Sequence, residues 1–222
     1  MFDKLDLMLA GEAFDASIQM ALDEILLRKV TLPMLRIYRW EAPCVTFGYF
    51  QKIEQVRATY PALPVVRRWT GGGMVEHGKD LTFSLMIPKG DSCATMPPVD
   101  FYRTLHGRLA VSLSKMASSA IRLAGEGDLR VGPSCFSAPA PDDLLLGREK
   151  ILGGAQRRSA GALLYQGSLQ GMGVFSMLPD PMVLALALSS TIAGRNLMPT
   201  LKQEALDLAE SRYRRPEWNG RR

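Results

Sequence analysis

The sequence predicts an α+β fold in which a mixed, mostly antiparallel sheet is flanked by helices. Two long segments, 14–29 and 100–119, place apolar residues at the spacing of an amphipathic helix. Around them lie short apolar or alternating runs of strand length, separated by glycine and proline. Strands that come in runs, with helices segregated between them, are typical of the α+β class. Because 222 residues suit one large domain, we expect residues 1–222 to form a single domain.

The predicted elements follow from local patterns along the chain. Phe14, Ile18, Leu22 and Ile25 share one face of the first helix, and Pro43 separates the first two strands. Strands are expected at 35–40, 44–48, 64–69, 74–77, 81–87, near 129–131, and at 143–146, 150–157 and 162–169. Two further helices are expected at 181–189 and 201–214, and loops at 88–98 and 132–142.

Composition places the chain among ordinary globular proteins. It is 47% hydrophobic and 22% charged, which excludes a disordered or collagen-like chain. No apolar run approaches the roughly 18 to 20 residues that a membrane span needs, and the mixed, acidic first residues do not resemble a secretory signal. Three widely spaced cysteines argue against a disulfide scaffold and fit a reducing compartment. We therefore expect a cytoplasmic protein.

The formal net charge is +5, from 27 lysines and arginines against 22 acidic residues. So thin an excess does not by itself indicate nucleic-acid binding. Five arginines are expected to form a solvated basic tail: Arg212, Arg214, Arg215, Arg221 and Arg222. A mildly positive surface would also suit an acidic protein partner. Composition leaves both interpretations open.

Several common catalytic motifs are excluded. The stretch from Gly73 to Asp80 is close to a phosphate-binding P-loop, but Asp80 replaces the required hydroxyl residue and a strand pattern follows. Metal chemistry finds no support in two histidines, His77 and His106, without paired cysteine or histidine motifs. We expect His106, inside a helix, to be hydrogen-bonded or exposed. A serine hydrolase is disfavoured because no Gly-x-Ser-x-Gly motif is present.

Three consecutive glycines, Gly71, Gly72 and Gly73, follow a strand that ends in Arg67 and Arg68. Three glycines allow the backbone to pass very close to a ligand, although an ordinary hairpin turn is the alternative. The two arginines are either surface charges or groups that meet a phosphate or carboxylate. Together these residues indicate a ligand-facing loop.

The cysteines differ in their surroundings. Cys44 lies in an apolar strand and is expected to be a buried small side chain. Cys93 lies in a predicted loop with no activating group nearby. Cys135 lies in a proline-bounded loop that could hold a thiol partly exposed, although most lone cysteines are inert.

Taken in order, several blocks resemble the lipoate–protein ligase and octanoyltransferase family, which shares its catalytic domain with biotinyl ligases. The family hallmark, Arg-Arg-x-Thr/Ser-Gly-Gly-Gly/Arg-x-Val-x-His, is matched by residues 67–77. Its lysine segment, Gly-x-Lys-Ile-x-Gly-Ser-Ala-Gln-x-Arg, is similar to residues 147–158. The Gln-His-Gly-Ser-Ile block is similar to residues 165–169, and the opening at 35–51 also agrees. The resemblance covers most of the chain.

The resemblance implies one of two chemistries on an α+β fold. Ligases activate lipoate with ATP and magnesium, whereas octanoyltransferases carry octanoate from acyl carrier protein through a cysteine thioester to a lysine of a lipoyl domain. Cys135-Phe-Ser-Ala-Pro139 is similar to the Cys-Phe-x-x-Pro segment of the cysteine-dependent branch. The resemblance thus favours an octanoyltransferase of lipoate biosynthesis that needs no cofactor, with Cys135 as nucleophile and Lys150 at the acyl carbonyl oxygen.

The implied partners are acyl carrier protein and the lipoyl domains of 2-oxoacid dehydrogenases or the glycine-cleavage H protein. We expect a monomer that binds neither nucleic acid nor membrane. The alternatives are an ATP-dependent lipoate or biotin ligase and a non-catalytic relative that binds acyl groups or lipoyl domains.

The resemblance also implies a set of substrate-binding residues: Arg68, Thr70, Gly71, Gly72, Gly73, His77, Gly153, Gly154, Ala155, Gln166, Gly167 and Ser168. On residue chemistry alone, His77 is as readily a hydrogen-bonded structural histidine. Two positions depart from the family pattern: Gln166 stands where a histidine is usual, and Gly154 replaces a serine. Either change could alter acyl or acceptor preference, or mark an inactive relative.

Two further expectations concern the surroundings of the site. Val65, Val66 and Val75 are expected to wall an apolar acyl tunnel. Arg67, Arg157 and Arg158 are expected to be exposed and to steer acidic partners toward the site.

Overall fold

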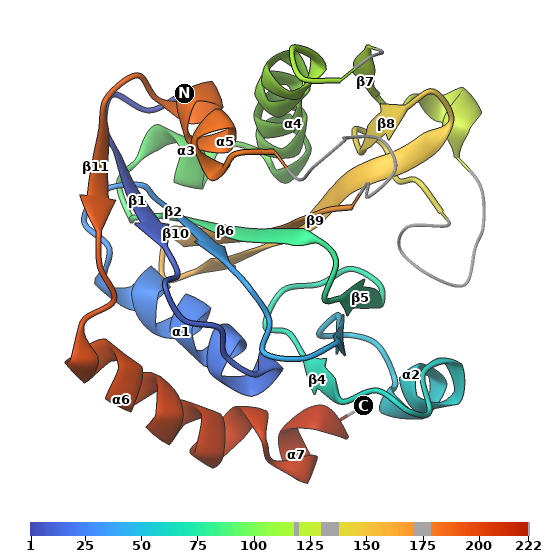
Figure 1. Cartoon of the computed structure of the whole chain (residues 1–222), viewed down its shortest axis with the longest axis vertical. Helices are drawn as coiled ribbons and strands as arrows, with labels where there is room; N and C mark the ends of the chain where they lie inside the picture. The colour runs from blue at the N-terminus through green and yellow to red at the C-terminus, as the bar shows by residue number, and fades with distance from the viewer. Residues whose placement is uncertain (118–119, 130–137, 171–178, 222) are drawn as a thin grey trace.

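A computed structural model describes residues 1–117, 120–129, 138–170 and 179–221. Its centre is an eight-stranded sheet with the strand order β11-β1-β2-β6-β10-β9-β8-β7 (Figure 1). The strands are β1 (Leu5–Leu9), β2 (Met34–Tyr38), β6 (Leu81–Ile87), β7 (Ile121–Leu123), β8 (Leu144–Leu146), β9 (Glu149–Ser159), β10 (Ala162–Leu169) and β11 (Ile192–Arg195). Strand β1 is parallel to β2 and β11, and the other pairs are antiparallel. The predicted mixed, mostly antiparallel sheet is confirmed.

A second, three-stranded sheet has the order β4-β3-β5 and consists of β4 (Val65–Arg67), β3 (Cys44–Phe47) and β5 (Val75–His77). Strand β3 is parallel to β4 and antiparallel to β5. Because β3 lies between them, β4 and β5 are not paired, and the glycines that join them do not form a simple hairpin turn. The hairpin alternative for this loop is therefore wrong.

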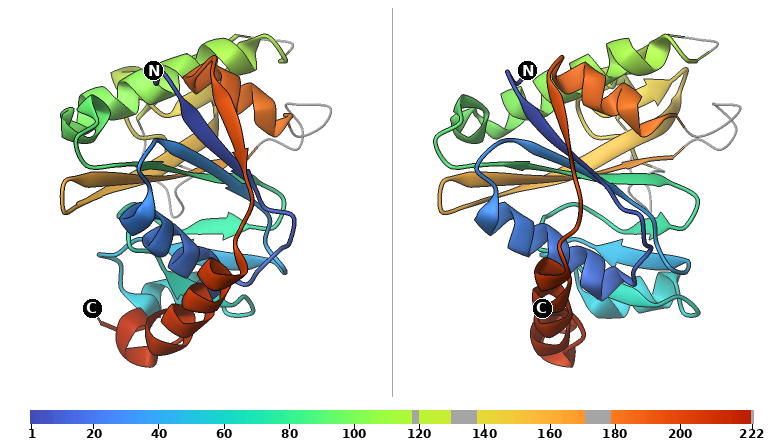
Figure 2. Two further views of the ribbon diagram at one scale, coloured as in Figure 1. Left: turned by 90° about the vertical axis from the view of Figure 1, so that its left-hand side faces the viewer. Right: turned by 60° about the vertical axis from the view of Figure 1, so that its left-hand side comes forward.

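Helices cover both faces of the large sheet (Figure 2). On one face lie α4 (Pro98–Ser114) and α5 (Pro181–Leu188), which pack on each other. On the other face lies α1 (Ala16–Lys29), which packs against the sheet and against α6 (Pro199–Leu208). Most of α1 is buried, because the helix is enclosed between the large sheet and α6. Asp15 begins this helix by accepting a hydrogen bond from the Ile18 amide.

The two faces of the sheet carry separate apolar cores. The core under α4 includes Leu35, Phe83, Phe101 and Leu105, and the core around α1 includes Leu22. Burying one such side chain contributes roughly 1.5–3 kcal/mol relative to leaving it exposed. The sheet is thus held by apolar contacts on both sides, which fixes the strands that carry the site.

Most predicted elements are present within a few residues of their expected ends. The helix expected over 100–119 ends at Ser114, and residues 121–123, for which no strand was expected, form an edge strand. The expected loop at 88–98 contains a short helix, α3 (Ser92–Thr95). The patterns did not indicate β1, β11, α2 (Ile53–Thr59) or α7 (Pro216–Asn219). Of the strand predicted near 129–131, Leu129 is not in a strand, and residues 130–131 lie outside the described residues.

The arginine-rich segment is packed against the fold rather than free as a tail, although Arg214, Arg215 and Arg221 are exposed. Arg212 pairs with the fully buried Glu24 of α1, and Arg214 pairs with Asp15. The segment continues from α6 through a π-helical turn (Ala209–Tyr213) into α7, and Tyr213 and Trp218 are buried against α1 and its neighbours. Ion pairs thus account for Arg212 and Arg214, and Arg222 lies outside the described residues.

Candidate functional site

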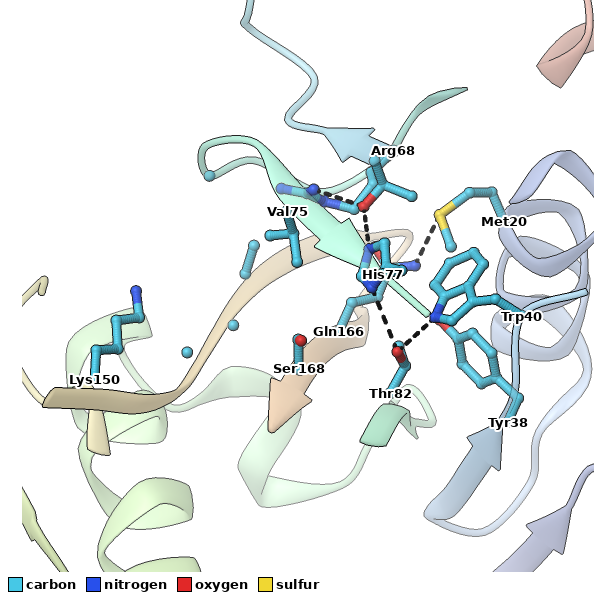
Figure 3. Close-up of a pocket in the computed structure, with 16 residues that line it drawn as sticks. Met20, Tyr38, Trp40, Arg68, Val75, His77, Thr82, Lys150, Gln166 and Ser168 are labelled. Carbon is cyan, nitrogen blue, oxygen red and sulfur yellow. Dashed lines mark hydrogen bonds between the residues drawn. The ribbon is translucent and has the colours of Figure 1, made fainter. Parts of the chain in front are cut away.

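A pocket lies between the large sheet and the small sheet. Its lining comes from α1, β2, β3, β5, β6, β9, β10 and the loops beside them: Met20, Tyr38, Trp40, Thr46, Arg68, Gly72, Val75, His77, Thr82, Lys150, Gly153, Gly154, Ala155, Gln166, Gly167 and Ser168. Figure 3 shows Lys150 at one side of the pocket and Met20, Trp40 and Tyr38 at the opposite side. Ten of the sequence-predicted site residues therefore share one cavity.

The floor of the pocket is formed by glycines on β9 and β10, which pair in register with Gly154 opposite Gly167. A Cβ on Gly153 would lie 2.5 Å from Lys150 Cε, and one on Gly167 would lie 2.6 Å from the Phe83 ring. A Cβ on Gly154 would overlap the phenol of Tyr165. Side chains are absent here because neighbouring side chains occupy their space.

The departure at Gly154 is explained by this packing. A serine cannot stand at position 154 while Tyr165 keeps its place, since the Cβ of the serine would overlap the phenol. The Tyr165 hydroxyl is held by the His106 ring nitrogen Nε2 at 2.6 Å. Gly154 and Tyr165 are therefore a matched pair in this chain.

The glycine loop, residues 71–73, is held from two sides. Arg68 donates hydrogen bonds to the carbonyls of Gly71 at 2.8 Å and Gly73 at 2.9 Å. On the other side, a Cβ on Gly48 would overlap the Gly72 carbonyl, so the 48–51 turn presses directly on the loop. Gly72, with a φ of +85°, lines the pocket, whereas Gly71 and Gly73 do not.

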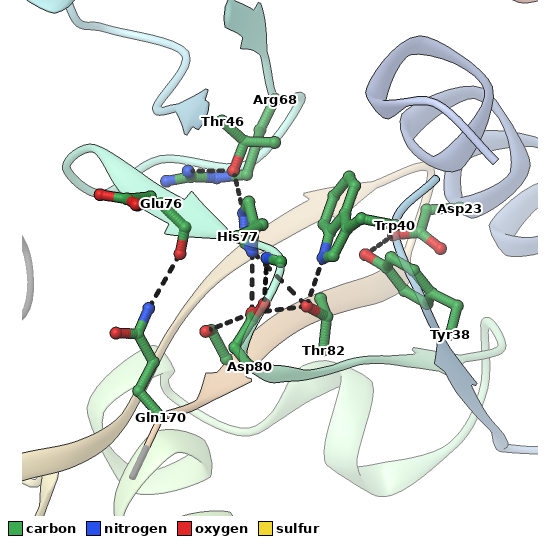
Figure 4. A network of polar contacts seen from close by, with 12 residues as sticks. Asp23, Tyr38, Trp40, Thr46, Arg68, Glu76, His77, Asp80, Thr82 and Gln170 are labelled. Carbon is green, nitrogen blue, oxygen red and sulfur yellow. Dashed lines mark hydrogen bonds and ion pairs between the residues drawn. The ribbon is translucent and has the colours of Figure 1, made fainter. Parts of the chain in front are cut away.

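His77 is enclosed by partners on both ring nitrogens. Its Nδ1 lies 2.8 Å from Asp80 Oδ2, and its Nε2 lies 2.7 Å from Thr46 Oγ1. The Trp40 indole stacks on the imidazole with ring centres 4.2 Å apart, and its Nε1 donates to Thr82 at 2.7 Å (Figure 4). His77 thus lines the pocket with both ring nitrogens hydrogen-bonded, as expected for a structural histidine.

The Asp80 carboxylate forms hydrogen bonds with three residues of this network. Burial raises the pKa of its carboxyl, but hydrogen bonds from His77, Thr82 and Ser168 outweigh burial, so the pKa lies below its usual value. The Ser168 hydroxyl donates to Asp80 Oδ2 at 2.7 Å. An ionised carboxylate therefore orders three pocket residues at once.

Lys150 is almost completely buried and forms an ion pair with Asp143, Nζ to Oδ2 2.7 Å. Asp143 Oδ1 accepts a hydrogen bond from the Tyr102 hydroxyl at 2.6 Å, and that hydroxyl accepts one from the Gly154 amide at 3.0 Å. Burial raises the pKa of Tyr102 well above its usual value, so the phenol stays protonated. The ammonium is thus directed by a chain of hydrogen bonds that starts on the pocket floor.

His106 is a satisfied structural histidine, as one of the two sequence alternatives held. Burial lowers its pKa to about 3, so the ring is neutral. Its Nδ1 donates to the Asp142 carbonyl at 2.7 Å, which leaves Nε2 to accept from Tyr165. It supports the region around Lys150 without lining the pocket.

Gln166 lines the pocket and joins two distant segments. Its Oε1 accepts from the Thr70 hydroxyl at 2.7 Å, and its Nε2 donates to Asp23 Oδ2 at 2.7 Å. Asp23 is fully buried on α1 and also accepts from Arg36 at 2.7 Å and Ser84 at 2.5 Å. Thr70 is buried and, without lining the pocket, connects the glycine loop to β10.

Sequence reasoning missed several residues of the site, including Met20, Asp23, Trp40, Thr46 and Asp80. Asp23 carried a usable signal, because a charged residue among the apolar residues of 20–27 must find a buried partner. Asp80 carried one as well, since it lies three residues after His77. The others come from elements far apart in the sequence, and nothing local marks them as neighbours.

Three expectations about the surroundings are wrong, namely those for Val65, Val66 and Arg67. Val65 and Val66 do not line the pocket, whereas Val75 does. Arg67 is completely buried and cannot steer a partner. Arg157 and Arg158 are half-buried: Arg157 lies over the Trp69 ring at 4.5 Å, and Arg158 donates to the Ala94 carbonyl at 3.2 Å.

The cysteines complete the account of the predicted site. Cys135 lies outside the described residues. Cys44 is buried, as expected, and burial raises its pKa to about 12. Cys93 is also buried, in the short helix α3 rather than in a loop, and burial raises its pKa. Neither described thiol is suited to act as a nucleophile.

Within the described ranges, no group of three or more His, Cys, Asp or Glu side chains is arranged to hold a metal ion. The same residues include no helix that is long and apolar enough to cross a membrane. What the pocket offers is an apolar and aromatic wall, a floor of backbone, and a buried ammonium at one side. Such an arrangement suits an extended apolar group that ends in a carbonyl oxygen.

Curated proteins similar to this chain are octanoyltransferases. Octanoyltransferase LipM from Moorella thermoacetica is 28% identical over 214 residues, which cover 91% of this chain and 77% of that protein. Octanoyltransferase LipM from Oceanobacillus iheyensis is 37% identical over 172 residues, covering 70% of this chain and 60% of that protein. The chain thus spans between three fifths and about three quarters of these relatives.

Solved structures agree with the fold. A putative lipoate protein ligase from T. acidophilum with bound lipoic acid superposes with a TM-score of 0.74 at 22% identity, with both chains covered completely. A lipoate-protein ligase A bound with ATP has a TM-score of 0.71 at 22% identity, covering 99% of this chain and 98% of that one. The family model of the lipoyl protein ligase A/B catalytic domain matches residues 15–181. With most of its length matched and a relative at 37% identity, the chain belongs to the lipoyl protein ligase A/B catalytic domain family.

Proposed function

We propose that the protein is an octanoyltransferase of lipoate biosynthesis, which moves an octanoyl or lipoyl group from acyl carrier protein to a lysine of a lipoyl domain or H protein. The observation that carries the proposal is the pocket itself, in which a buried ammonium faces a cavity with apolar and aromatic walls. Two relatives of the chain are named octanoyltransferases, which supports the same activity.

In the proposed mechanism, the Cys135 thiolate attacks the carbonyl carbon of the acyl carrier thioester. The carrier thiolate leaves and takes up a proton, and an acyl thioester remains on Cys135. The amine nitrogen of the acceptor lysine then attacks that thioester, forming the amide and releasing the Cys135 thiol. Thioester to amide is downhill, so the transfer needs no ATP.

Lys150 is proposed to donate a hydrogen bond to the acyl oxygen while negative charge develops there. Its ion pair with Asp143 supports this role because the carboxylate holds the lysine Nζ in one position. The proposed substrate-binding surface comprises Arg68, Gly72, His77, Gly153, Gly154, Ala155, Gln166, Gly167 and Ser168, with Thr70, Gly71 and Gly73 behind it.

In this proposal, the acyl chain lies along the glycine floor, with its methyl end toward Met20, Tyr38 and Trp40. Glycines suit such a floor because they bring backbone close to the chain without side-chain bulk. His77 and Asp80 would hold the wall and exchange no proton with the substrate, since both imidazole nitrogens already have partners.

The partners are part of the proposal. One solved relative in the fold comparison is a bipartite lipoate protein ligase and its E2 lipoyl domain from Thermoplasma acidophilum. A lipoyl domain is accordingly proposed as the acceptor, with acyl carrier protein as the donor and the enzyme acting as a monomer. Arg157 and Arg158 remain the proposed steering charges, because both keep part of their surface in solvent.

The test is the intact mass of the protein after mixing with octanoyl-acyl carrier protein in the absence of ATP. An octanoyl adduct that hydroxylamine removes is the expected result. A reaction that instead requires ATP, magnesium and free octanoate or lipoate would identify the ligase alternative. Binding without any adduct or turnover would identify a non-catalytic relative.

A further inference from the structure

Arg67 binds two separate segments with one buried side chain. Toward α7, its Nε donates to the Trp218 carbonyl at 3.0 Å and its Nη2 to the Asn219 carbonyl at 2.8 Å. Toward the 48–51 turn, its Nη1 donates to the carbonyls of Tyr49 at 2.6 Å and Gln51 at 2.8 Å. The guanidinium has no solvent exposure, so its N–H groups must be satisfied within the protein.

The backbone around Arg67 is tied to α7 as well. The Arg67 amide donates to Asn219 Oδ1 at 2.8 Å, and the Trp218 indole Nε1 donates to the Arg67 carbonyl at 3.0 Å. Undocking α7 would remove the acceptors of three buried donors at once. The guanidinium would be left with buried N–H groups that have lost their acceptors, so it would have to move. The 48–51 turn would then lose the hydrogen bonds that Arg67 donates to it.

The 48–51 turn in turn supports the glycine loop. The Tyr49 amide donates to the Thr70 carbonyl at 2.8 Å, and Gly48 packs directly against the Gly72 carbonyl. Gly72 lines the pocket, and the Thr70 side chain reaches the pocket residue Gln166. Contacts are therefore continuous from α7 through Arg67 and the turn to the pocket.

We propose that Arg67, Trp218 and Asn219 are positioning residues that hold the glycine loop in the shape that binds the acyl chain. The identity of this ligand rests on the proposed function, whereas the coupling between α7 and the loop does not. Docked α7 should raise the affinity of the pocket for an acyl ligand. Because coupling between two sites is reciprocal, the bound ligand should raise the equilibrium constant for α7 docking by the same factor.

The coupling is tested first without ligand, by amide hydrogen exchange of the full chain. Asn219→Ala removes the Oδ1 acceptor of Arg67 and should speed exchange at least threefold in peptides covering 48–51 and 70–74. Glu217→Ala is the matched control, since Glu217 is exposed on the same helix, and it should leave both peptides unchanged. If Asn219→Ala does not fold, Trp218→Phe removes the indole hydrogen bond to the Arg67 carbonyl and reduces the ring packed against Tyr49, and it should give a smaller shift in the same peptides. Unchanged exchange in the loop peptides of the folded variant would overturn the proposal.

The second arm uses octanoic acid as the probe. In the wild type, octanoate should slow exchange of the 216–221 amides, and Asn219→Ala should weaken octanoate binding about tenfold, with Glu217→Ala at the wild-type affinity. Octanoate binding that leaves 216–221 unprotected would overturn the reciprocal coupling. If the wild type does not bind octanoate but Asn219→Ala still speeds exchange in the loop peptides, the proposed ligand is contradicted and the coupling between α7 and the loop stands.

Discussion

The two sides of the pocket are built in opposite ways. Around His77, each polar group is tied into a network of Thr46, Asp80, Thr82 and Ser168, and the aromatic wall is fixed by stacking. Around Lys150, one ammonium is directed by one carboxylate over a floor that carries no side chains. The difference indicates that the His77 side holds a shape, whereas the Lys150 side presents a charge.

The largest effect is expected from the proposed nucleophile, Cys135, which in the proposed mechanism attacks the carbonyl whose oxygen Lys150 contacts. Cys135→Ser should abolish acyl-enzyme formation from octanoyl-acyl carrier protein, because a serine hydroxyl is not ionised at neutral pH. Cys44→Ser and Cys93→Ser are the controls and should retain the adduct. Mass spectrometry decides the outcome, and an adduct that persists in Cys135→Ser would remove this residue from the mechanism.

Lys150→Arg keeps the charge but replaces a compact ammonium with a broad planar group that the space above Gly153 does not fit. We expect the transfer rate to fall about a hundredfold or more, comparable to the loss of an oxyanion donor. Single-turnover kinetics measure this loss. Turnover close to that of the wild type would show that the lysine does not contact the acyl oxygen.

The matched pair on the pocket floor gives a stability test. Gly154→Ser should destabilise the fold by about 1–3 kcal/mol, because its Cβ overlaps the Tyr165 phenol. Tyr165→Leu frees that space, so the double variant should lose less stability than the two single variants added together. Urea unfolding of all four proteins measures the interaction, and strict additivity would contradict the steric pairing.

On the opposite side, His77→Gln should weaken acyl binding more than it slows chemistry. The amide can keep one of the two ring contacts, so we expect KM to rise several-fold while kcat changes little. Steady-state kinetics with octanoyl-acyl carrier protein separate the two parameters. A large loss of kcat with an unchanged KM would make His77 a participant in proton transfer and would end the contrast between the two sides.

The smallest effect concerns the surface around the pocket. Transfer from the carrier protein should slow a few-fold as salt rises, because exposed charges are screened over about 8 to 10 Å. A small neutral thioester such as octanoyl N-acetylcysteamine should respond little. Arg157→Gln and Arg158→Gln should flatten the salt dependence with the carrier protein. Equal responses of both donors would leave the basic charge without a docking role.

Local patterns were sufficient for much of the fold. Helical spacing located α1, and alternation or short apolar runs located β2, β6 and β10, since each buries one or both faces along its own length. Strand β1 and the edge strand β11 were missed, and β11 is largely exposed, so burial leaves little pattern in its sequence. The short helices α2 and α7 span too few residues to show a helical period.

The site was predicted unevenly for a related reason. The glycine loop, Gly153 and Lys150 were found because their motifs are contiguous in the sequence. The pairing of Gly154 with Tyr165 depends on the register of β9 and β10, and the contact of Asp23 with Gln166 depends on the packing of α1 against the sheet. The contact of His77 with Thr46 depends on the pairing of β3 with β5. No spacing rule within one segment contains that information.

The two neighbouring arginines, Arg67 and Arg68, show which features the sequence determined and which only the tertiary structure decided. The sequence by itself determined that a basic pair precedes three glycines, and that this block marks a ligand-facing loop. Only the tertiary structure decided their directions: Arg68 turns toward the glycine loop and the pocket, and Arg67 turns away, into a buried position under α7. The reason is that a guanidinium stays exposed unless the chain supplies enough acceptors. The acceptors of Arg67 come from turn residues 16 and 18 positions away and from α7 residues 151 and 152 positions away.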